Sequence, residues 1–351
     1  MVALYITSTT SAGKTAFCAG IAQKLLDSGS KVGFMMPVHI TEAAETNGCR
    51  DSIFIKEVLK LTESDELLCP IRLSQQELRR NLTEDQSNFS RNLKEAYGKV
   101  SPGKDVVIME GMGDLETDEV STLASHTVAE ALEAKVVVIV DYSPKLDVAN
   151  IAQIGSKIGN LVGVVINFVP VSKIDRVKRE LTGALGKAGV KVLGVCPEVR
   201  SLLGVTVEEL AKTLSGEILT AAGKCKEIIE NVMLGAMTVD SGITYYNRKE
   251  NKAVVVRGER ADMQLAALQT PTNCLIVTNG VKPLPVVVVQ AEEKQVPIIL
   301  VKQDTNTAVA GIEKALAESS FRSRQKLETF KKVLEGCFDF GALYSGLGLK
   351  P

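Results

Sequence analysis

The 351-residue chain has little of what two broad classes of protein depend on. It contains no tryptophan, aromatic residues make up 4% of it, and its formal net charge is -1. Nucleic-acid binding draws on a positive field and on aromatic stacking surfaces, so we expect no nucleic-acid partner. No apolar run approaches the roughly 20 residues that span a bilayer, and no leader-like segment precedes the first apolar run, so we expect no membrane association.

The number and spacing of the histidines and cysteines argue against a nucleophilic triad, a disulfide framework and a zinc site. Neither of the two histidines, His39 and His126, stands beside a nucleophile motif, so we expect both to be structural or exposed. The seven cysteines are odd in number and form no C-x-x-C pair, which argues against a disulfide framework and against a zinc site. Reduced, buried thiols are typical of a cytoplasmic protein, and we expect that localisation here.

The segment with the clearest chemical meaning directly follows the first apolar run, residues 2–6. From Ser8 to Thr15 it has the arrangement of a P-loop, in which a strand and a turn of small residues lead into a helix. Backbone N–H groups in such a turn form an anion site, where Lys14 would reach the β- and γ-phosphates and Thr15 would ligate Mg²⁺. The predicted nucleotide-binding residues of this loop are Ser8, Ala12, Gly13, Lys14, Thr15 and Ala16.

The loop departs from its motif at one position. The pattern G-x-x-x-x-G-K-[ST] requires glycine where this chain has Ser8. If φ must be positive there, serine tolerates the turn less well than glycine, and a degenerate loop without affinity is the alternative to a working site. The context favours a working site, because Phe17, Ile21 and Leu25 give the following helix one apolar face.

Short β-branched runs alternate with helical stretches through the first two hundred residues. The runs are continuously apolar, which is typical of strands covered on both faces in a parallel sheet. We therefore expect an α/β protein, with a doubly wound, mainly parallel P-loop domain over 1–218 and a smaller α/β domain over 219–351. The predicted strands are 4–6, 32–35, 106–109, 136–140, 164–167 and 190–195 in the first domain, and 253–256, 275–278 and 297–301 in the second.

Several segments are harder to assign. Residues 62–80 carry several charges and a proline, so we expect them to be irregular. Residues 285–290 contain four valines, which favours a strand, while the spacing of the neighbouring strands favours a crossover helix. We expect helices over 205–214 and 322–335, and a frayed glycine-rich tail after Gly341.

Polar residues end two of the predicted strands. Glu110 follows the run 106–109, at the edge of a doubly wound sheet where ligands bind, and we predict that it acts with Lys14 in catalysis and faces the metal ion. Asp51 heads a helix-like stretch and is either an N-cap or a metal ligand. Asn167 ends another strand and either contacts the edge of a purine or caps a loop.

The order of these motifs has a family resemblance. The P-loop, the strands that end in Glu110 and Asn167, and the run Pro-Glu-Val-Arg-Ser-Leu-Leu at 197–203 resemble the dethiobiotin synthetase family. They resemble still more the dethiobiotin-synthetase-like N-terminal domain of certain phosphate acetyltransferases. The resemblance implies ATP as ligand and a homodimer that pairs across the nucleotide. The residues that it implies are Thr15, Asp51 and Glu110 for Mg²⁺, Asn167 for adenine, and Pro197 as a further nucleotide contact.

One substitution separates the chain from the ligases of that family. Dethiobiotin synthetases carry a Lys-Pro pair after the second strand, and that lysine acts on the carbamate substrate. This chain has Met36-Pro37 there, so no ammonium group can stabilise developing negative charge at that position. We therefore do not expect ligase chemistry, although phosphate binding is unaffected by the change.

The second half of the chain resembles the DRTGG domain over roughly 230–320. The resemblance is carried by the segments 234–237, 257–264, 278–283 and 301–305. In that family the domain lies between the P-loop domain and an acetyltransferase domain and is thought to be regulatory. The present sequence ends at Pro351, so we expect a stand-alone relative without the acetyltransferase domain.

Five residues of this half are candidates for a second ligand site. Gly258, Asn279 and Gly280 follow apolar strands and could line one crevice, with Arg260 as the partner of an anion. Asn279 replaces the usual first glycine of a Gly-Gly pair, and asparagine tolerates the left-handed conformation. The alternative is that Arg260 and Asp262 form an ion pair that only supports the fold.

These observations lead to one main hypothesis and two alternatives. The main hypothesis is an ATP- and Mg²⁺-binding regulatory protein or slow ATPase that forms a homodimer, with a metabolic enzyme as a candidate partner. The first alternative is an ATP-dependent ligase of the dethiobiotin synthetase type that acts on a small carboxylate or amine. The second is a non-catalytic interaction module with a degenerate nucleotide site.

Overall fold

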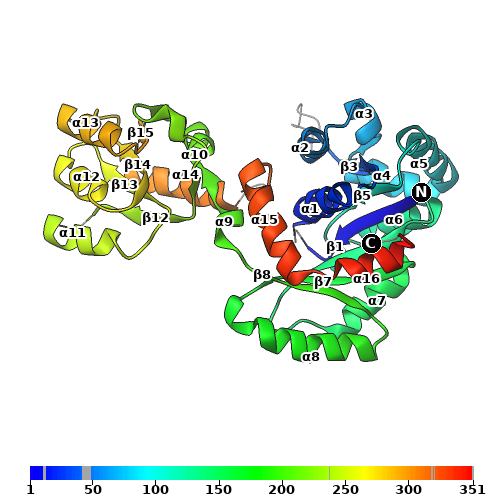
Figure 1. Ribbon diagram of the computed structural model, residues 1–351. Helices are drawn as coiled ribbons and strands as arrows, with labels where there is room; N and C mark the ends of the chain where they lie inside the picture. The colour runs from blue at the N-terminus through cyan, green and yellow to red at the C-terminus, as the bar shows by residue number, and fades with distance from the viewer. Residues whose placement is uncertain (11–12, 42–48, 237, 318, 320, 350–351) are drawn as a thin grey trace. The chain divides into compact units, whose positions relative to one another are not determined.

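The computed structural model describes residues 1–10, 13–41, 49–236, 238–317, 319 and 321–349 (Figure 1). The chain forms two units. The first unit consists of Met1–Glu198 and Phe321–Pro351, and the second is Val199–Ser320. The expected division at 218/219 differs from this grouping in two ways: the second unit begins already at Val199, and the C-terminal segment from Phe321 packs with the P-loop unit.

The first unit is built on a six-stranded parallel sheet with the strand order β2-β5-β1-β6-β7-β8. The order reverses direction at β1, so the sheet is doubly wound as the apolar runs predict. Its central strands are buried along almost their whole length, since helices cover both faces. The strands are β1 (Val2–Ser8), β2 (Val32–Met35), β5 (Val106–Glu110), β6 (Lys135–Asp141), β7 (Leu161–Val169) and β8 (Val192–Pro197).

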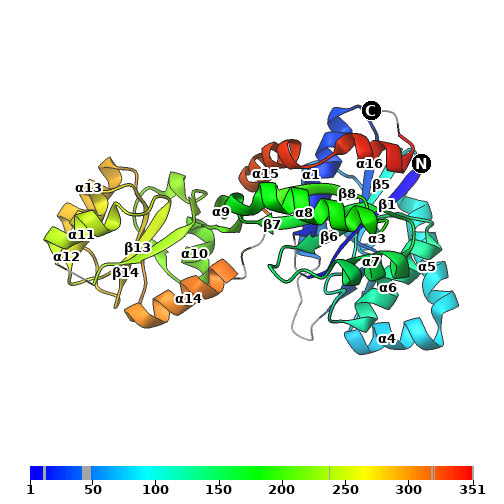
Figure 2. The same ribbon diagram turned by 90° about the horizontal axis from the view of Figure 1, so that it is seen from below.

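The helices of the first unit form two layers (Figure 2). On one face, five helices share a continuous apolar core with alternate residues of the strands. They are α4 (Gln75–Glu84), α5 (Gln86–Val100), α6 (Glu119–Ala131), α7 (Val148–Ile158) and α8 (Ile174–Lys187). The other face carries α1 (Lys14–Asp27) and α15 (Arg324–Cys337), with α2 (Arg50–Leu59) beside α1.

The expectation that residues 62–80 are irregular is wrong. They contain α3 (Asp65–Leu68), β4 (Ile71–Leu73), which pairs with β3 (Val38–Ile40), and the start of α4. A capping box starts α4, because the Ser74 hydroxyl accepts from the N–H of Glu77 while the Glu77 carboxylate accepts from the N–H of Ser74. The pattern S-x-x-E is visible in the sequence, but the charges on the solvent side of α4 masked it.

The C-terminal tail is also ordered, contrary to the frayed end expected after Gly341. Helix α16 (Phe340–Leu347) buries Leu343 and Leu347 and contacts β7 and β8, and the Asp339 carboxylate caps it by accepting from the N–H of Ala342. In α15, Phe330 and Leu334 lie so close to Gly20 of α1 that a Cβ atom there would come 3.0 Å from the Leu334 side chain. This close contact joins the tail to the P-loop unit.

Two disulfides are present where we expected only reduced thiols. Cys49 pairs with Cys69, and Cys196 of β8 pairs with Cys337 at the end of α15. The partners are 20 and 141 residues apart, so no local spacing in the sequence indicates them. The remaining three cysteines are free. Within the described residues, no helix combines the length and the apolar character needed to cross a membrane.

The second unit is a smaller α/β layer structure with the strand order β10-β15-β14-β13-β12. The last four strands are parallel to one another, and β10 pairs in the antiparallel sense. The strands are β10 (Glu217–Ile218), β12 (Asn231–Leu234), β13 (Lys252–Arg257), β14 (Thr272–Thr278) and β15 (Ile298–Leu300). A two-stranded ribbon, β9 (Val205–Thr206) with β11 (Ile228–Ile229), stands beside them.

Helices cover both faces of this second sheet as well. The valine-rich segment 285–290 belongs to a crossover helix, with Pro285 in its first turn and Val287 and Ala291 buried. The helix expected over 205–214 begins only at Val207, after the short strand β9. The helices are α9 (Arg200–Leu203), α10 (Val207–Thr213), α11 (Val239–Tyr246), α12 (Ala261–Leu268), α13 (Pro285–Glu293) and α14 (Thr305–Ala317).

Candidate nucleotide and metal site

The predicted P-loop turn joins β1 to α1 and opens the helix at a glycine. Gly13 is the N-cap of α1 and has φ 87°, a left-handed conformation that residues with a Cβ rarely adopt. A Cβ atom at this position would also lie 3.4 Å from the amide nitrogen of Asn167. The first turn of α1 contains no acidic side chain, so the positive end of its dipole is not offset. Ala16 is buried in this turn, and Ala12 lies outside the described residues.

The serine that replaces the first motif glycine fits without backbone strain. Ser8 is the last residue of β1, and it is not among the residues with positive φ. Its hydroxyl accepts a 3.2 Å hydrogen bond from Nζ of Lys14 and donates to the carbonyl oxygen of Thr10. Lys14 also lies against Gly113, where a Cβ atom would come 2.7 Å from Nζ. The serine at this position therefore contributes a contact to the lysine.

Thr15 and Glu110 face each other directly. The hydroxyl of Thr15 donates a 2.7 Å hydrogen bond to Oε1 of Glu110. Glu110 is only 4% exposed, and its other oxygen, Oε2, has no hydrogen-bond partner among the described residues. Burial, followed by the nearby charge of Asp51, raises the pKa of Glu110 to about 7. A buried carboxylate oxygen without a partner is unfavourable, and a cation bound at this atom would offset that cost.

Asp51 is the second acidic residue of the site, and the structure excludes one of the two roles that the sequence left open for it. The N-cap of α2 is Cys49, so Asp51 is not the cap. Asp51 lines the same cavity as Lys14 and Glu110. Its Oδ1 accepts a 2.8 Å hydrogen bond from Nε of Arg322.

The oxygen donors of this region fit Mg²⁺ better than a cation that needs a full protein cage. Within the described part of the chain, no group of three or more His, Cys, Asp or Glu side chains could hold a metal ion. Mg²⁺ is commonly held by one or two carboxylates together with phosphate oxygens and water. Asp51, Glu110 and the hydroxyl of Thr15 match that requirement.

A cavity of about 470 Å³ adjoins these residues. Met36, at the position of the lysine in the related ligases, lines it, and so does His39, which we expected to be structural or exposed. Gln75 reaches it from α4, within a segment expected to be irregular. No motif in the sequence indicates His39 or Gln75, because the fold alone brings β3 and α4 to this edge. The charged residues of the wall are Lys14, Asp51, Glu110, Asp114 and Asp118.

Asn167 and Pro197 lie at the carboxyl ends of neighbouring strands. Asn167 pairs with Asp141 of β6, and Pro197 pairs with Val169 of β7. Asn167 is 5% exposed and lies next to Gly13, so the predicted adenine contact and the P-loop are adjacent. Phe168, which the sequence did not single out, has φ 56°, and its ring lies 4.0 Å from the position of a Cβ atom at Gly13. A non-glycine residue held in this conformation is locally strained backbone.

In the second unit, the predicted ligand residues are brought to one edge of the sheet, but they already have partners. Val281 occupies the space beside Gly258, since a Cβ atom there would come 2.4 Å from Cβ of Val281. Arg260 and Asp262 form an ion pair, with an N–O distance of 2.8 Å, as in the alternative to an anion site. Asn279 and Gly280 have φ of 68° and 67°, so the turn survives the loss of its first glycine.

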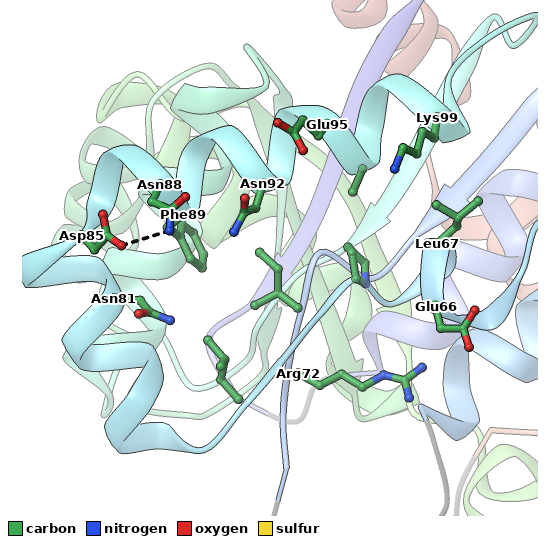
Figure 3. Close-up of a pocket in the computed structure, with 14 residues that line it drawn as sticks. Glu66, Leu67, Arg72, Asn81, Asp85, Asn88, Phe89, Asn92, Glu95 and Lys99 are labelled. Atoms are coloured by element: carbon green, nitrogen blue, oxygen red, sulfur yellow. Dashed lines mark hydrogen bonds between the residues drawn. The ribbon is translucent and has the colours of Figure 1, made fainter.

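Another cavity of the first unit, of about 450 Å³, lies between α3, β4, α4 and α5 (Figure 3). Its charged residues are two cations, Arg72 and Lys99, and three carboxylates, and a hydrogen bond of 3.0 Å joins Asn88 to Asp85. None of the P-loop residues is among the described residues of its wall, whereas Lys14 lines the cavity of about 470 Å³, so the predicted phosphate site lies at that cavity. The carboxylates are Glu66, Asp85 and Glu95.

This fold and this edge of the sheet define a P-loop protein. Comparison with protein families matches residues 2–206 to a family described as an AAA domain, and because this is more than half of the chain, the chain belongs to that family. Residues 209–315 match the DRTGG domain. The order of a dethiobiotin-synthetase-like P-loop domain and a DRTGG domain, predicted from the motifs, is confirmed.

Curated relatives extend this likeness over nearly the whole chain. A phosphate acetyltransferase of Nitratidesulfovibrio vulgaris is 24% identical, and the match covers 98% of this chain and 51% of the relative. A phosphate acetyltransferase of Haemophilus influenzae is 19% identical, with 96% and 51% covered. The chain therefore spans about half the length of the curated relatives that it matches.

Among solved structures, the CBS and DRTGG domains of the regulatory region of Clostridium perfringens pyrophosphatase are 21% identical. That match covers 32% of this chain and 47% of the other, with a TM-score of 0.29. A score this low supports no argument about function.

Proposed function

We propose that the chain binds ATP with Mg²⁺ at the edge formed by the P-loop, Asp51 and Glu110, and that it acts as a regulatory protein or slow ATPase. One observation carries the proposal. The Thr15–Glu110 pair leaves a buried carboxylate oxygen without a partner, next to a glycine-opened helix N-terminus and Lys14. Phosphate and a divalent cation are the ligands that these two features suit together.

The roles of the residues follow from their chemistry. Lys14 and the N–H groups at the start of α1 bind the phosphates, and Thr15, Asp51 and Glu110 hold the metal ion. Bound Mg²⁺ would neutralise charge that develops on the phosphates. Asn167 lies beside Gly13 with an amide that can both donate and accept, which suits the edge of a purine. The choice of adenine rests on the family resemblance.

The residues that line the 470 Å³ cavity favour a regulatory role over ligase chemistry on an acyl or carbamate substrate. Among the described residues that line it, Lys14 is the only lysine or arginine, and Met36 stands where the related ligases have a lysine. Without that second ammonium group, negative charge on an acyl or carbamate substrate is poorly stabilised. The likeness to phosphate acetyltransferases suggests that such an enzyme is the partner, and the resemblance suggests a homodimer.

The same wall supports a second candidate function. Its carboxylates, four in number, suit a small amine better than a carboxylate. An ATP-dependent ligase that acts on an amine is therefore the runner-up. The carboxylates are Asp51, Glu110, Asp114 and Asp118.

Calorimetry with ATP and GTP, each with and without Mg²⁺, tests the proposal on the wild type and on Lys14→Ala. We expect Mg²⁺-dependent binding of ATP that is lost in Lys14→Ala. Phosphate release should be slow and unchanged by small diamines, and light scattering should give the mass of a dimer. Turnover that requires an amine would favour the ligase, and absence of heat with either nucleotide would contradict both functions.

A further inference from the structure

The segment that returns from the second unit contacts the metal edge of the P-loop unit. Arg322 is the second residue of this segment, and its Nε donates to Oδ1 of Asp51 over 2.8 Å. The two residues are 271 positions apart in the chain. Arg322 lies beyond residues 209–315, which match the DRTGG domain, and beyond the P-loop region.

The guanidinium group contacts Asp51 from outside the cavity. Asp51 lines the 470 Å³ cavity together with Glu110 and Lys14, whereas Arg322 is not among the described residues of its wall. An arginine inside the cavity would compete with a metal ion for the same carboxylates. An arginine behind one of them instead fixes the direction in which that carboxylate points.

Aromatic contacts of the preceding residue, Phe321, fix the backbone beside the arginine. The ring of Phe321 packs edge-on against Phe54 of α2, with centroids 6.2 Å apart, and against Phe330 of α15 at 5.5 Å. Phe330 in turn packs against Phe17 of α1 at 5.0 Å. Arg322 is thereby fixed relative to both helices of the site, α2 with Asp51 and α1 with the P-loop, and rigid support of this kind is what a positioning residue needs.

We propose that Arg322 is a positioning residue of the metal site: it holds the Asp51 carboxylate in the orientation that a divalent cation needs. The proposal rests on the function proposed above. The pair is about one-third exposed on each side, at 33% and 32%, so its contribution to folding stability is small. Contacts to a metal-bound side chain commonly change metal affinity by about 10- to 100-fold, so the effect of Arg322 belongs to metal binding.

The test is a Mg²⁺ titration of nucleotide binding in four proteins of full length. They are the wild type, Arg322→Ala, Arg322→Lys, and Arg324→Ala as a control that removes an exposed arginine two positions away. A fluorescent, non-hydrolysable ATP analogue reports binding, and the Mg²⁺ concentration at half-saturation is measured. We expect Arg322→Ala to raise this concentration about 10-fold or more, Arg322→Lys to recover part of the loss, and Arg324→Ala to match the wild type.

Two further measurements separate positioning from other roles. Melting temperatures and nucleotide affinity without Mg²⁺ should be the same in Arg322→Ala and in the wild type. In an Asp51→Asn background, Arg322→Ala should cause no further change, because the residue acts through Asp51. An additional loss of affinity in that background would overturn the proposal.

Other outcomes are equally clear. Unchanged half-saturation in Arg322→Ala would overturn the proposal and leave the proposed function intact. Tighter Mg²⁺ binding in Arg322→Ala would also overturn it, because the arginine would then be a competitor of the metal ion. If the wild type binds the analogue without any Mg²⁺ dependence, the proposed metal site itself fails, and the role of Arg322 fails with it.

Discussion

The hydroxyl of Thr15 lies 2.7 Å from Oε1 of Glu110, so the first turn of α1 is joined directly to the end of β5. The contact connects residues 95 positions apart and leaves Oε2 of a buried carboxylate without a partner in the described part of the chain. Burial of a carboxylate without full compensation costs stability. A site arranged in this way is less stable than it would be with that oxygen paired.

Glu110→Gln should separate stability from metal binding. Because the neutral amide is easier to bury, we expect the variant without ligand to unfold at the same or slightly higher urea concentration than the wild type. We expect its Mg²⁺-dependent nucleotide affinity to fall by roughly tenfold or more, since a metal ligand counts for at least as much as an outer contact. Urea denaturation and calorimetry provide the two measurements.

A matched pair at position 15 controls for this experiment. Thr15→Ser keeps the hydroxyl and should retain metal-dependent binding, whereas Thr15→Ala should lose it to about the same extent as Glu110→Gln. Equal Mg²⁺ dependence in Thr15→Ala and the wild type would show that the hydroxyl is not a metal ligand.

Gly258→Ala should destabilise the second unit, although this glycine was a candidate for ligand binding. The new Cβ atom would come 2.4 Å from Cβ of Val281 and 2.6 Å from its carbonyl oxygen, so the backbone must shift. Overpacking of this kind typically costs about 1–3 kcal/mol. Gly223→Ala, where nothing lies within 4 Å of the added atom, is the control. Equal unfolding free energies for the two variants, measured in urea, would contradict the packing role.

Lys252 should make the stability of the chain depend on alkaline pH. Its side chain is fully buried at the start of β13, where Nζ donates to the carbonyl oxygen of Pro271 over 2.6 Å, and burial lowers its pKa to about 8. Between pH 8 and the ordinary value near 10.5, the unfolded chain binds the proton more strongly than the folded chain. The free energy of unfolding contributed by this group therefore rises with pH across that range, by up to about 3 kcal/mol.

Comparison with Lys252→Met separates the contribution of Lys252 to the free energy of unfolding from that of other groups that titrate at alkaline pH. Urea unfolding of both proteins at pH 7.5 and pH 10.5 should show the wild type gaining stability relative to the variant. Lys294→Met, which removes an exposed lysine that also donates to a backbone carbonyl, is the matched control. A difference between wild type and Lys252→Met that stays constant with pH would refute the prediction.

The fold was largely predictable because its signals are local. Continuous apolar runs such as Val136–Val140 locate parallel strands, and their burial in the middle of the sheet confirms the reasoning. The valine-rich helix α13 was ambiguous because valine favours strands, and only its place between two parallel strands decides the matter. The tail was misjudged because its glycines suggested fraying, whereas Leu343 and Leu347 are buried against the sheet.

The candidate site was predictable only where a motif fixes the spacing. Lys14, Thr15 and the strand-end Glu110 follow from the P-loop pattern and from strand polarity, and the structure brings them together. Arg322 and His39 reach the same edge from other parts of the chain, through contacts that depend on the packing of α15 and on the pairing of β3 with β4. No periodicity or spacing in the sequence encodes such contacts.

The two disulfides can be tested directly, because the sequence led us to expect reduced cysteines at these positions. With Cys49–Cys69 and Cys196–Cys337 formed, protein purified without reductant and then denatured should show three free thiols, against seven after reduction. The link at β8 closes a loop of 141 residues, so the double variant Cys196→Ser and Cys337→Ser should lose about 2–5 kcal/mol of unfolding free energy relative to the oxidised wild type. Cys225→Ser, which removes a free thiol, is the control. Seven free thiols without reductant would restore the expectation of a reduced protein, and the tail would then be held to the sheet by packing of α15 and α16 alone.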